Sequence, residues 1–348
     1  MKFKIFFQAC FLPKKNLRHF IIPIFQYSII PLLFFFLVVS CKKEKSTIVF
    51  TDVSPGTDFN IYAVRKLTDD TLMACGGKDN KGIVLRSADK GTSWSVLNDS
   101  FDQVIYDFYF INDHLGFAGG GTPDVFKTTD GGKNWEKLYL PFPLTGFPPN
   151  YRSPLRKIFF VNDSLGFICG GGKFEAGIIF KTADQGLNWT LTTFQYELRG
   201  ILFLNDQTGY ACGFGVMLKT TDSGNNWTVI KSPNEFYTSL MKYPDDIYTS
   251  GYNGGIYKTS IADIDWQPVN SSNNAYSSRS HFNLITSSAN GTLIAAGDGG
   301  FISISTDQGS SWDEGESFNG VTIKSILTLD NHSGIAAGND GKIFKFSW

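Results

Sequence analysis

A ten-residue segment that recurs along the chain constrains its fold more than any other feature. Residues 126–135 read FKTTDGGKNW: a hydroxyl residue, an aspartate two positions later, a glycine and a closing tryptophan. Five copies keep this pattern, and a sixth at 257–266 has Ile261 in place of the aspartate. The closing tryptophans recur every 38 to 54 residues, which indicates one structural unit of about forty residues per copy. The five intact copies contain Asp89 and Trp94, Asp130 and Trp135, Asp184 and Trp189, Asp222 and Trp227, and Asp307 and Trp312.

The clearest unit contains four strand-like runs. They cover residues 158–161, 166–169, 177–182 and 189–192, and turn-forming residues separate them. Four antiparallel strands repeated radially are typical of an all-β, seven-bladed β-propeller with four-stranded blades, and a solenoid of β-units is the alternative. Seven units can be counted, with first strands that begin near Ile61, Val104, Arg156, Arg199, Leu240, His281 and Thr322.

The seventh unit is short. The chain ends at Trp348, inside the third strand of that unit, so its fourth strand is missing. Residues 47–51 form a strand-like run that belongs to no unit. We expect this run to pair with residues 342–348 as the outer strand of the last blade, because that pairing removes an open sheet edge.

The recurring segment itself predicts a structural turn. Its aspartate and hydroxyl can accept backbone N–H groups across the turn, its glycine supplies an otherwise strained backbone geometry, and its tryptophan buries a large ring. The alternative, a catalytic or metal-binding set of aspartates, would require these residues to converge. In a propeller they are instead spread around the rim.

The first residues predict export. Residues 1–19 are basic, residues 20–39 are almost wholly apolar, and the run VVSC ends at Cys41. This pattern is typical of a signal peptide, and VVSC resembles a bacterial lipobox in which the cysteine is lipidated. We therefore expect a signal at 1–41, a tether at 42–46 and the propeller at 47–348, with Cys41 anchoring the protein at the outer membrane or the periplasmic face of the cell envelope. An uncleaved membrane helix is the alternative.

Three cysteines remain for the propeller, Cys75, Cys169 and Cys212. They share one repeat position, where the other units have a small residue, so we expect buried free thiols rather than disulfides. The sequence has no CxxC and no histidine cluster, and we expect neither a metal nor a cofactor. The formal net charge of -1 and the lack of a basic excess argue against nucleic acid as a partner.

A first candidate binding site follows from the start of each first strand, because these positions line the channel of a propeller. Tyrosines and cations dominate there, which predicts a ring that binds an anionic or peptide ligand. Ordinary half-exposed strand starts are the alternative interpretation. The positions are Tyr62, Tyr106, Arg156, Arg199, Tyr237, His281 and Lys324, with Arg279 beside the sixth.

A second candidate is the overlong third unit. Its extra residues form two loops, at 139–154 and 171–177, that map to the same face as the ring. Long loops on a rigid scaffold often carry recognition, although a tolerated insertion is the alternative. The loops are unusually aromatic, so we expect them to contact a partner through Tyr139, Phe142, Phe147, Tyr151 and Phe174.

The pattern S/T-x-D-x-G-x-x-W is similar to the Asp-box, or BNR, repeat. The longer pattern, with GFICGG before IIFKTADQGLNW, resembles the photosystem II stability/assembly factor family over about residues 47–348. This resemblance implies a seven-bladed propeller and a role in binding a client protein during assembly. It implies no particular activity, because relatives of this family outside photosynthetic organisms mostly lack an assigned role.

The Asp-box repeat also occurs in sialidases and xyloglucanase-type propellers, so a glycoside hydrolase is the alternative function. Such an enzyme needs converging arginines and a tyrosine paired with a carboxylate. Arg156, Arg199 and Arg279 could supply the first, and Glu175 or Glu197 the carboxylate. The sequence fixes no tyrosine–carboxylate pair. We therefore expect a monomeric, lipid-anchored, non-catalytic propeller that binds an envelope protein or peptide.

Overall fold

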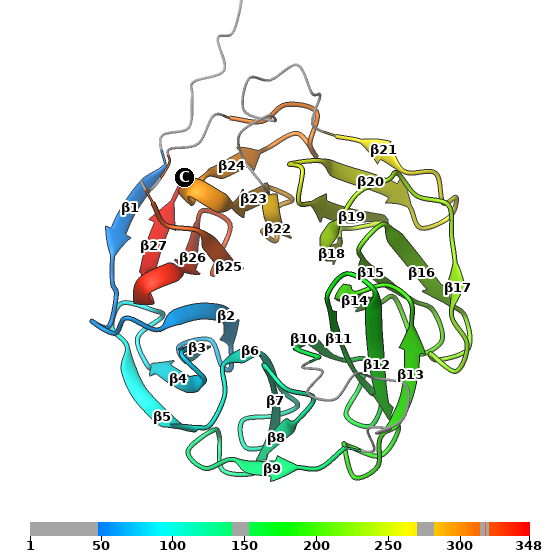
Figure 1. The fold of residues 1–348 in the computed structure, drawn as a ribbon. Helices are drawn as coiled ribbons and strands as arrows, with labels where there is room; N and C mark the ends of the chain where they lie inside the picture. The colour runs from blue at the N-terminus through cyan, green and yellow to red at the C-terminus, as the bar shows by residue number, and fades with distance from the viewer. Residues whose placement is uncertain (1–47, 141–152, 270–281, 314–316, 318–319) are drawn as a thin grey trace, which may run out of the picture. The chain divides into compact units, whose positions relative to one another are not determined.

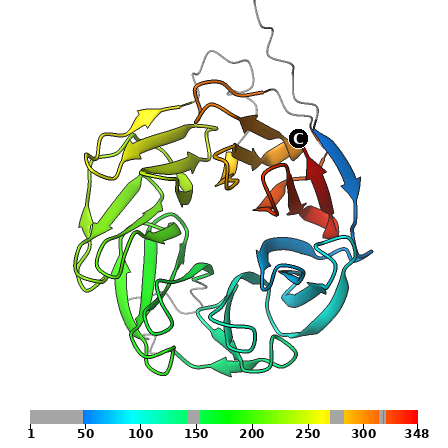
Figure 2. The same cartoon turned by 180° about the vertical axis from the view of Figure 1, so that it is seen from behind.

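The computed structural model describes residues 48–140, 153–269, 282–313, 317 and 320–348, and these form a seven-bladed β-propeller around a central channel (Figure 1). The reverse view shows the same ring of blades (Figure 2). The predicted all-β fold is confirmed, and the only helical elements described are two short 3₁₀ turns, η1 (Asp298–Gly300) and η2 (Asn339–Gly341). The proposed signal and tether lie outside the described residues.

Blades 1 to 3 follow one another along the chain, each with its first strand nearest the channel. Blade 1 consists of β2 (Asn60–Lys66), β3 (Leu72–Lys78), β4 (Lys81–Ser87) and β5 (Ser95–Phe101). Blade 2 consists of β6 (Ile105–Phe110), β7 (Gly116–Gly120), β8 (Val125–Thr128) and β9 (Glu136–Leu138). Blade 3 consists of β10 (Leu155–Phe160), β11 (Gly166–Gly172), β12 (Ala176–Thr182) and β13 (Thr190–Phe194).

Blades 4 to 6 repeat this order. Blade 4 consists of β14 (Leu198–Phe203), β15 (Gly209–Gly213), β16 (Val216–Thr220) and β17 (Thr228–Val229). Blade 5 consists of β18 (Tyr237–Lys242), β19 (Asp246–Gly251), β20 (Ile256–Ser260) and β21 (Gln267–Pro268). Blade 6 consists of β22 (Phe282–Ser287), β23 (Leu293–Gly297) and β24 (Ile302–Ser305), and in its described residues isolated bridges at Asp313 and Ser317 take the place of a fourth strand.

Blade 7 closes the ring with both ends of the described chain. It consists of β25 (Ile323–Thr328), β26 (Ser333–Gly338), β27 (Ile343–Ser347) and β1 (Val49–Asp52), and β1 lies beside β27 in Figure 1. The pairing is antiparallel, with Val49 opposite Ser347 and Asp52 opposite Phe344. The predicted closure by the N-terminal run is therefore confirmed.

The blades pack against one another through apolar clusters at each of the seven interfaces between the described strands. The second strand of each blade needs a small residue at one position, because the next blade approaches the strand closely there. A methyl group added at Gly119 would lie 2.9 Å from the Cβ of Leu155 on the next blade. Cys75, Cys169 and Cys212 occupy the same position as buried free thiols, as predicted, and burial raises the pKa of Cys169 to about 12.

The recurring turns are structural, as predicted. In the copy at 126–135, the hydroxyl of Thr128 donates to Asp130 at 2.9 Å and accepts the N–H of Gly132 at 3.0 Å. Asp130 also accepts the backbone and side-chain N–H groups of Asn134, and these bonds lower the pKa of Asp130 to about 2. The other intact copies repeat the hydroxyl–Asp and Gly–hydroxyl bonds. The box aspartates therefore fasten the turns between the third and fourth strands, at the rim of the ring.

Candidate binding site at the channel mouth

A β-bulge recurs at the start of the first strand in all seven blades, and it decides which side chains line the channel. In each blade the pairing with the second strand shifts register around one residue. A bulge leaves that residue without a partner and re-aims its side chain. The bulged residues line a channel of about 970 Å³, and we call them the channel ring: Tyr62, Tyr106, Arg156, Arg199, Thr238, Asn283 and Lys324.

Five of the seven ring residues were predicted from the sequence, and two positions differ. Tyr237 does not face the channel: it is fully buried, and its hydroxyl donates to the carbonyl of Pro233. Its neighbours Phe236 and Thr238 line the channel instead. The first strand of this blade begins at Tyr237, three residues before the predicted Leu240, which explains the error. Arg279 and His281 lie outside the described residues, and Asn283 takes the ring position of blade 6.

Aromatic rings hold the three cations of the channel ring. The Cζ atom of Arg156 lies 4.4 Å from the centre of the Tyr106 ring. The Nζ atom of Lys324 lies 5.2 Å from the ring centre of Tyr62, which in turn contacts Tyr106 edge to face at 4.7 Å. Such cation–π contacts position a cation without neutralising its charge.

Arg199 makes the same kind of contact with Phe236, at 5.2 Å from the ring centre. The sequence interpretation missed Phe236, because it directly precedes β18 and the predicted strand began later. The aromatic residue just before a first strand was the only available signal.

Two arginines of the channel ring share one buried carboxylate. The Glu197 side chain is only 3% exposed, and its Oε1 atom lies 2.6 Å from Nη2 of Arg199 and 4.0 Å from Nη2 of Arg156. Desolvation lowers the pKa of Arg199, and the charge of Arg156 lowers it further. The Nε atoms of both arginines are buried without a hydrogen-bond partner among the described residues. The two arginine side chains are still 21% and 29% exposed, so positive charge remains at the mouth. This suits a carboxylate, because guanidinium groups bind carboxylates in a bidentate way.

Lys324 adds a third cation from the opposite side of the ring. Burial lowers the pKa of Lys324, Asp298 raises it, and Arg156 lowers it. Asp298 also accepts a hydrogen bond from the side chain of Asn283 at 3.1 Å. The positive charge of the mouth is therefore concentrated on the side of blades 3 and 4.

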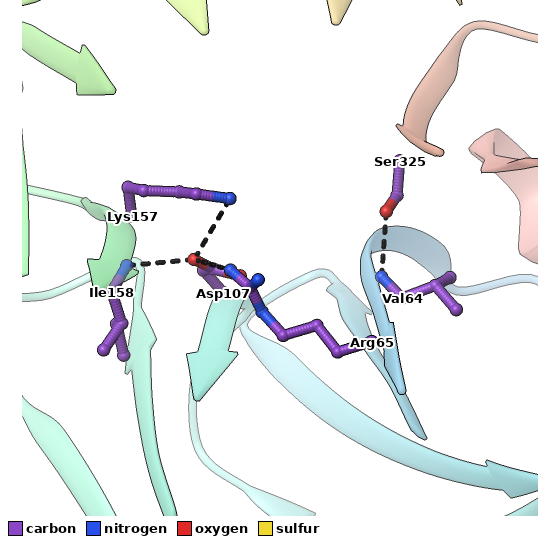
Figure 3. Close-up of polar contacts among 6 residues, drawn as sticks. All are labelled: Val64, Arg65, Asp107, Lys157, Ile158 and Ser325. Carbon is purple, nitrogen blue, oxygen red and sulfur yellow. Dashed lines mark hydrogen bonds and ion pairs between the residues drawn. The ribbon is translucent and has the colours of Figure 1, made fainter. Parts of the chain in front are cut away.

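A second charged cluster in the channel joins blades 1, 2 and 3 through the carboxylate of Asp107 (Figure 3). Asp107 accepts two hydrogen bonds of 2.7 Å from Nη2 of Arg65 and lies 3.7 Å from Nζ of Lys157. It also accepts the backbone N–H of Ile158 at 2.9 Å. Ile158 lies two residues after the bulged Arg156 of blade 3, and Asp107 of blade 2 accepts its N–H. The sequence interpretation missed this role. The signal was a carboxylate at a position where the other units, apart from Lys157 in blade 3, have small or apolar residues.

The second candidate, the overlong third unit, is only partly described. Tyr139 is exposed, while Phe142, Phe147 and Tyr151 lie outside the described residues. Phe174 is exposed at the turn between β11 and β12, and its ring centre lies 4.9 Å from that of Phe214 in blade 4.

The geometry asked of a glycosidase is met in part. Arg156 and Arg199 converge, but Glu197 is occupied by their ion pairs and Glu175 is exposed. Tyr62 has a raised pKa, first through burial and then through Tyr106, which disfavours the anion that a nucleophilic tyrosine needs.

Within the described ranges, no group of three side chains is arranged to hold a metal ion. No helix among those residues has the length and hydropathy to cross a bilayer.

Comparison with known families supports the same architecture. Residues 86–230 match the family model described as photosynthesis system II assembly factor YCF48. The chain resembles the photosystem II assembly factor family. This resemblance, predicted from the repeat, is confirmed over the part of the propeller that carries Arg156 and Arg199. A comparison with curated protein sequences found no match.

Solved structures similar to the chain share its fold at low sequence identity. YCF48 from Cyanidioschyzon merolae is 17% identical with a TM-score of 0.65, over 86% of this chain and 98% of that one. A structure of YCF48 bound to a D1 peptide is 17% identical with a TM-score of 0.66, over 86% and 95%. The WD40 β-propeller domain of Doa1 is 13% identical with a TM-score of 0.64, over 86% and 97%.

Proposed function

We propose that the channel mouth binds a carboxylate-bearing peptide segment of a client protein, and that the protein acts by holding this client without catalysis. The observation that carries the proposal is the sharing of Glu197 by Arg156 and Arg199. One carboxylate cannot neutralise two guanidinium groups, so a second anion is favoured beside them. Their aromatic supports fix the geometry before the ligand arrives, which reduces the entropy lost on binding.

A relative with the same fold supports a peptide as the ligand. YCF48 has been solved with a D1 peptide, and the family match of this chain spans both arginines of the mouth. The channel is about 970 Å³, a volume in the range of ligand pockets. A peptide end fits such an opening better than a folded surface does.

We place this activity in the bacterial cell envelope, with Cys41 as a lipid anchor and an envelope protein or peptide as the client. The VVSC run and the preceding basic and apolar segments support export. The direction of β1 supports an orientation. Val49 pairs with Ser347, and Trp348 donates its N–H to His332 in a turn between first and second strands. The described chain therefore begins at the Asp-box face. With an anchor preceding this point, the proposed orientation has the channel mouth facing away from the membrane.

Peptide binding with matched probes tests the client-binding proposal. Short alanine–serine peptides are compared by fluorescence anisotropy in three forms: with a free C-terminal carboxylate, with a C-terminal amide, and with an amide plus one aspartate side chain. We expect both carboxylate forms to bind about tenfold more tightly than the plain amide, because charge-assisted bonds are the stronger ones.

The variants Arg156→Gln and Arg199→Gln should each remove this preference. Arg86→Gln is the matched control, because Arg86 is exposed on β4 outside the channel lining. Equal binding of all three peptides to the unmodified protein would refute the proposed function. A preference that survives both mouth substitutions would refute the assignment of the site.

A further inference from the structure

Four aromatic side chains from three blades form a continuous exposed surface beside the channel mouth, which we call the aromatic patch: Phe174, Phe214, Phe236 and Tyr252. Phe214 lies 4.9 Å from Phe174 and 5.3 Å from Phe236, and Phe236 lies 6.0 Å from Tyr252, measured between ring centres. Three of the four are substantially exposed, at 49% for Phe174, 43% for Phe214 and 44% for Tyr252. A grouped apolar surface of this kind marks a binding site more often than scattered exposed residues do.

Two buried carboxylates fix the patch in place. Glu197 accepts the N–H of Phe174 at 3.2 Å, and its own N–H donates to the carbonyl of Phe174 at 3.2 Å. Glu235 accepts the N–H of Phe236 at 2.8 Å and two bonds from Asn253, at 3.3 and 3.0 Å. Rigid rings lose little entropy when they bind a ligand, so a patch fixed in this way is suited to recognition.

The turn that presents Phe174 is also strained. Phe174 has a φ of 65°, in the left-handed region that bulky residues rarely adopt. Strain in a non-glycine residue persists only where the surroundings enforce it, and it is concentrated at ligand sites. Here Glu197 enforces it.

Glu197 joins the patch to the arginines of the mouth. The same side chain that accepts the N–H of Phe174 is ion-paired with Arg199 and faces Arg156. Arg199 in turn lies 5.2 Å from the ring centre of Phe236. A carboxylate held at the arginines is therefore next to an apolar surface that extends over blades 3, 4 and 5.

We propose that the aromatic patch binds an apolar side chain next to the carboxylate of the peptide, so that the ligand is a C-terminal peptide end with an apolar residue close to its terminus. This inference rests on the proposed function, because the arginines must hold the carboxylate. The chain of such a ligand leaves the mouth over blades 4 and 5. The cations and the rings together match a ligand that is anionic at its end and apolar beside it.

Four peptides test this inference. They carry either leucine or serine as the penultimate residue, and each is made as the free acid and as the amide. On the unmodified protein we expect the leucine acid to bind about tenfold more tightly than the serine acid, from burial of one leucine side chain. The double variant Phe214→Ser/Tyr252→Ser should lose this leucine preference and keep the preference for acid over amide, which also shows that the variant folds.

Leu187→Ser is the matched control, since Leu187 is exposed in an Asp-box turn on the opposite face. A leucine preference of equal size in the double variant would overturn the inference, and so would the absence of a leucine preference in the unmodified protein. In both cases an intact acid preference would leave the proposed function standing. Loss of the acid preference in the unmodified protein would remove both.

Discussion

Asp107 of blade 2 accepts the backbone N–H of Ile158 of blade 3 at 2.9 Å. An equivalent hydrogen bond between blades occurs at the closure of the ring, where the Ser325 hydroxyl of blade 7 accepts the N–H of Val64 of blade 1 at 2.8 Å (Figure 3). Each of these N–H groups lies two residues beyond the bulged residue of its first strand, which is the innermost strand of its blade. Satisfying them from the preceding blade ties neighbouring blades together.

Asp107→Ala should therefore lower the free energy of unfolding by about 3–5 kcal/mol, the range for removing one partner of a buried ion pair. It leaves Arg65 and the N–H of Ile158 without their acceptor. Urea unfolding followed by circular dichroism measures this. Asp102→Ala is the control, because Asp102 is an exposed partner of Lys137 and its loss should cost less than about 1 kcal/mol. Equal losses for the two variants would contradict the assigned role.

Closure by β1 should depend on one face of the N-terminal run. Ile48 is 4% exposed and packs in the cluster between blades 6 and 7, whereas Val49 is 58% exposed. Ile48→Ala should cost about 2–4 kcal/mol through the cavity it leaves. Val49→Ala should change stability by no more than about 0.5 kcal/mol. Chemical denaturation of both variants checks the difference, and comparable effects would argue against a structural role for this strand.

The Asp-box turns should make the propeller sensitive to acid. Hydrogen bonds from Asn134 hold the pKa of Asp130 at about 2, below its usual value of 3.8. A depressed folded-state pKa contributes stability that is present above about pH 4 and is lost as the pH falls toward 2. The melting temperature of Asp130→Asn should thus fall less between pH 5 and pH 2 than that of the unmodified protein. Thermal unfolding of both proteins, measured at intervals of about one pH unit, checks this. Asp163→Asn, at an exposed turn position, should follow the unmodified curve.

The proposed anchor and orientation can be checked together. Fatty-acid labelling should require Cys41, so Cys41→Ser should be unlabelled. On vesicles with a quencher in the headgroup region, a fluorophore at Leu187→Cys, on the Asp-box face, should be quenched more than one at Tyr252→Cys. The cysteines of the propeller are buried and should not compete for the label. The reverse order of quenching would contradict the orientation without affecting the lipidation.

The sequence by itself determined the architecture, because the information for it is local and repeated. The box from Phe126 to Trp135 and its copies set the unit length, and the strand-like run at 47–51, which belongs to no unit, was predicted to complete the last blade. The shared small position at Cys75, Cys169 and Cys212 likewise followed from aligning the units. Each of these inferences needed only spacing along the chain.

Only the tertiary structure decided which side chains meet at the mouth. Side chains alternate along a strand, so an error of one residue around a bulge moves a side chain from the channel to the core, and this is what happened at Tyr237. Arg156, Glu197 and Arg199 come from two blades, and the aromatic patch comes from three. Their convergence depends on how the blades are rotated about a common axis, which no pattern within one unit specifies.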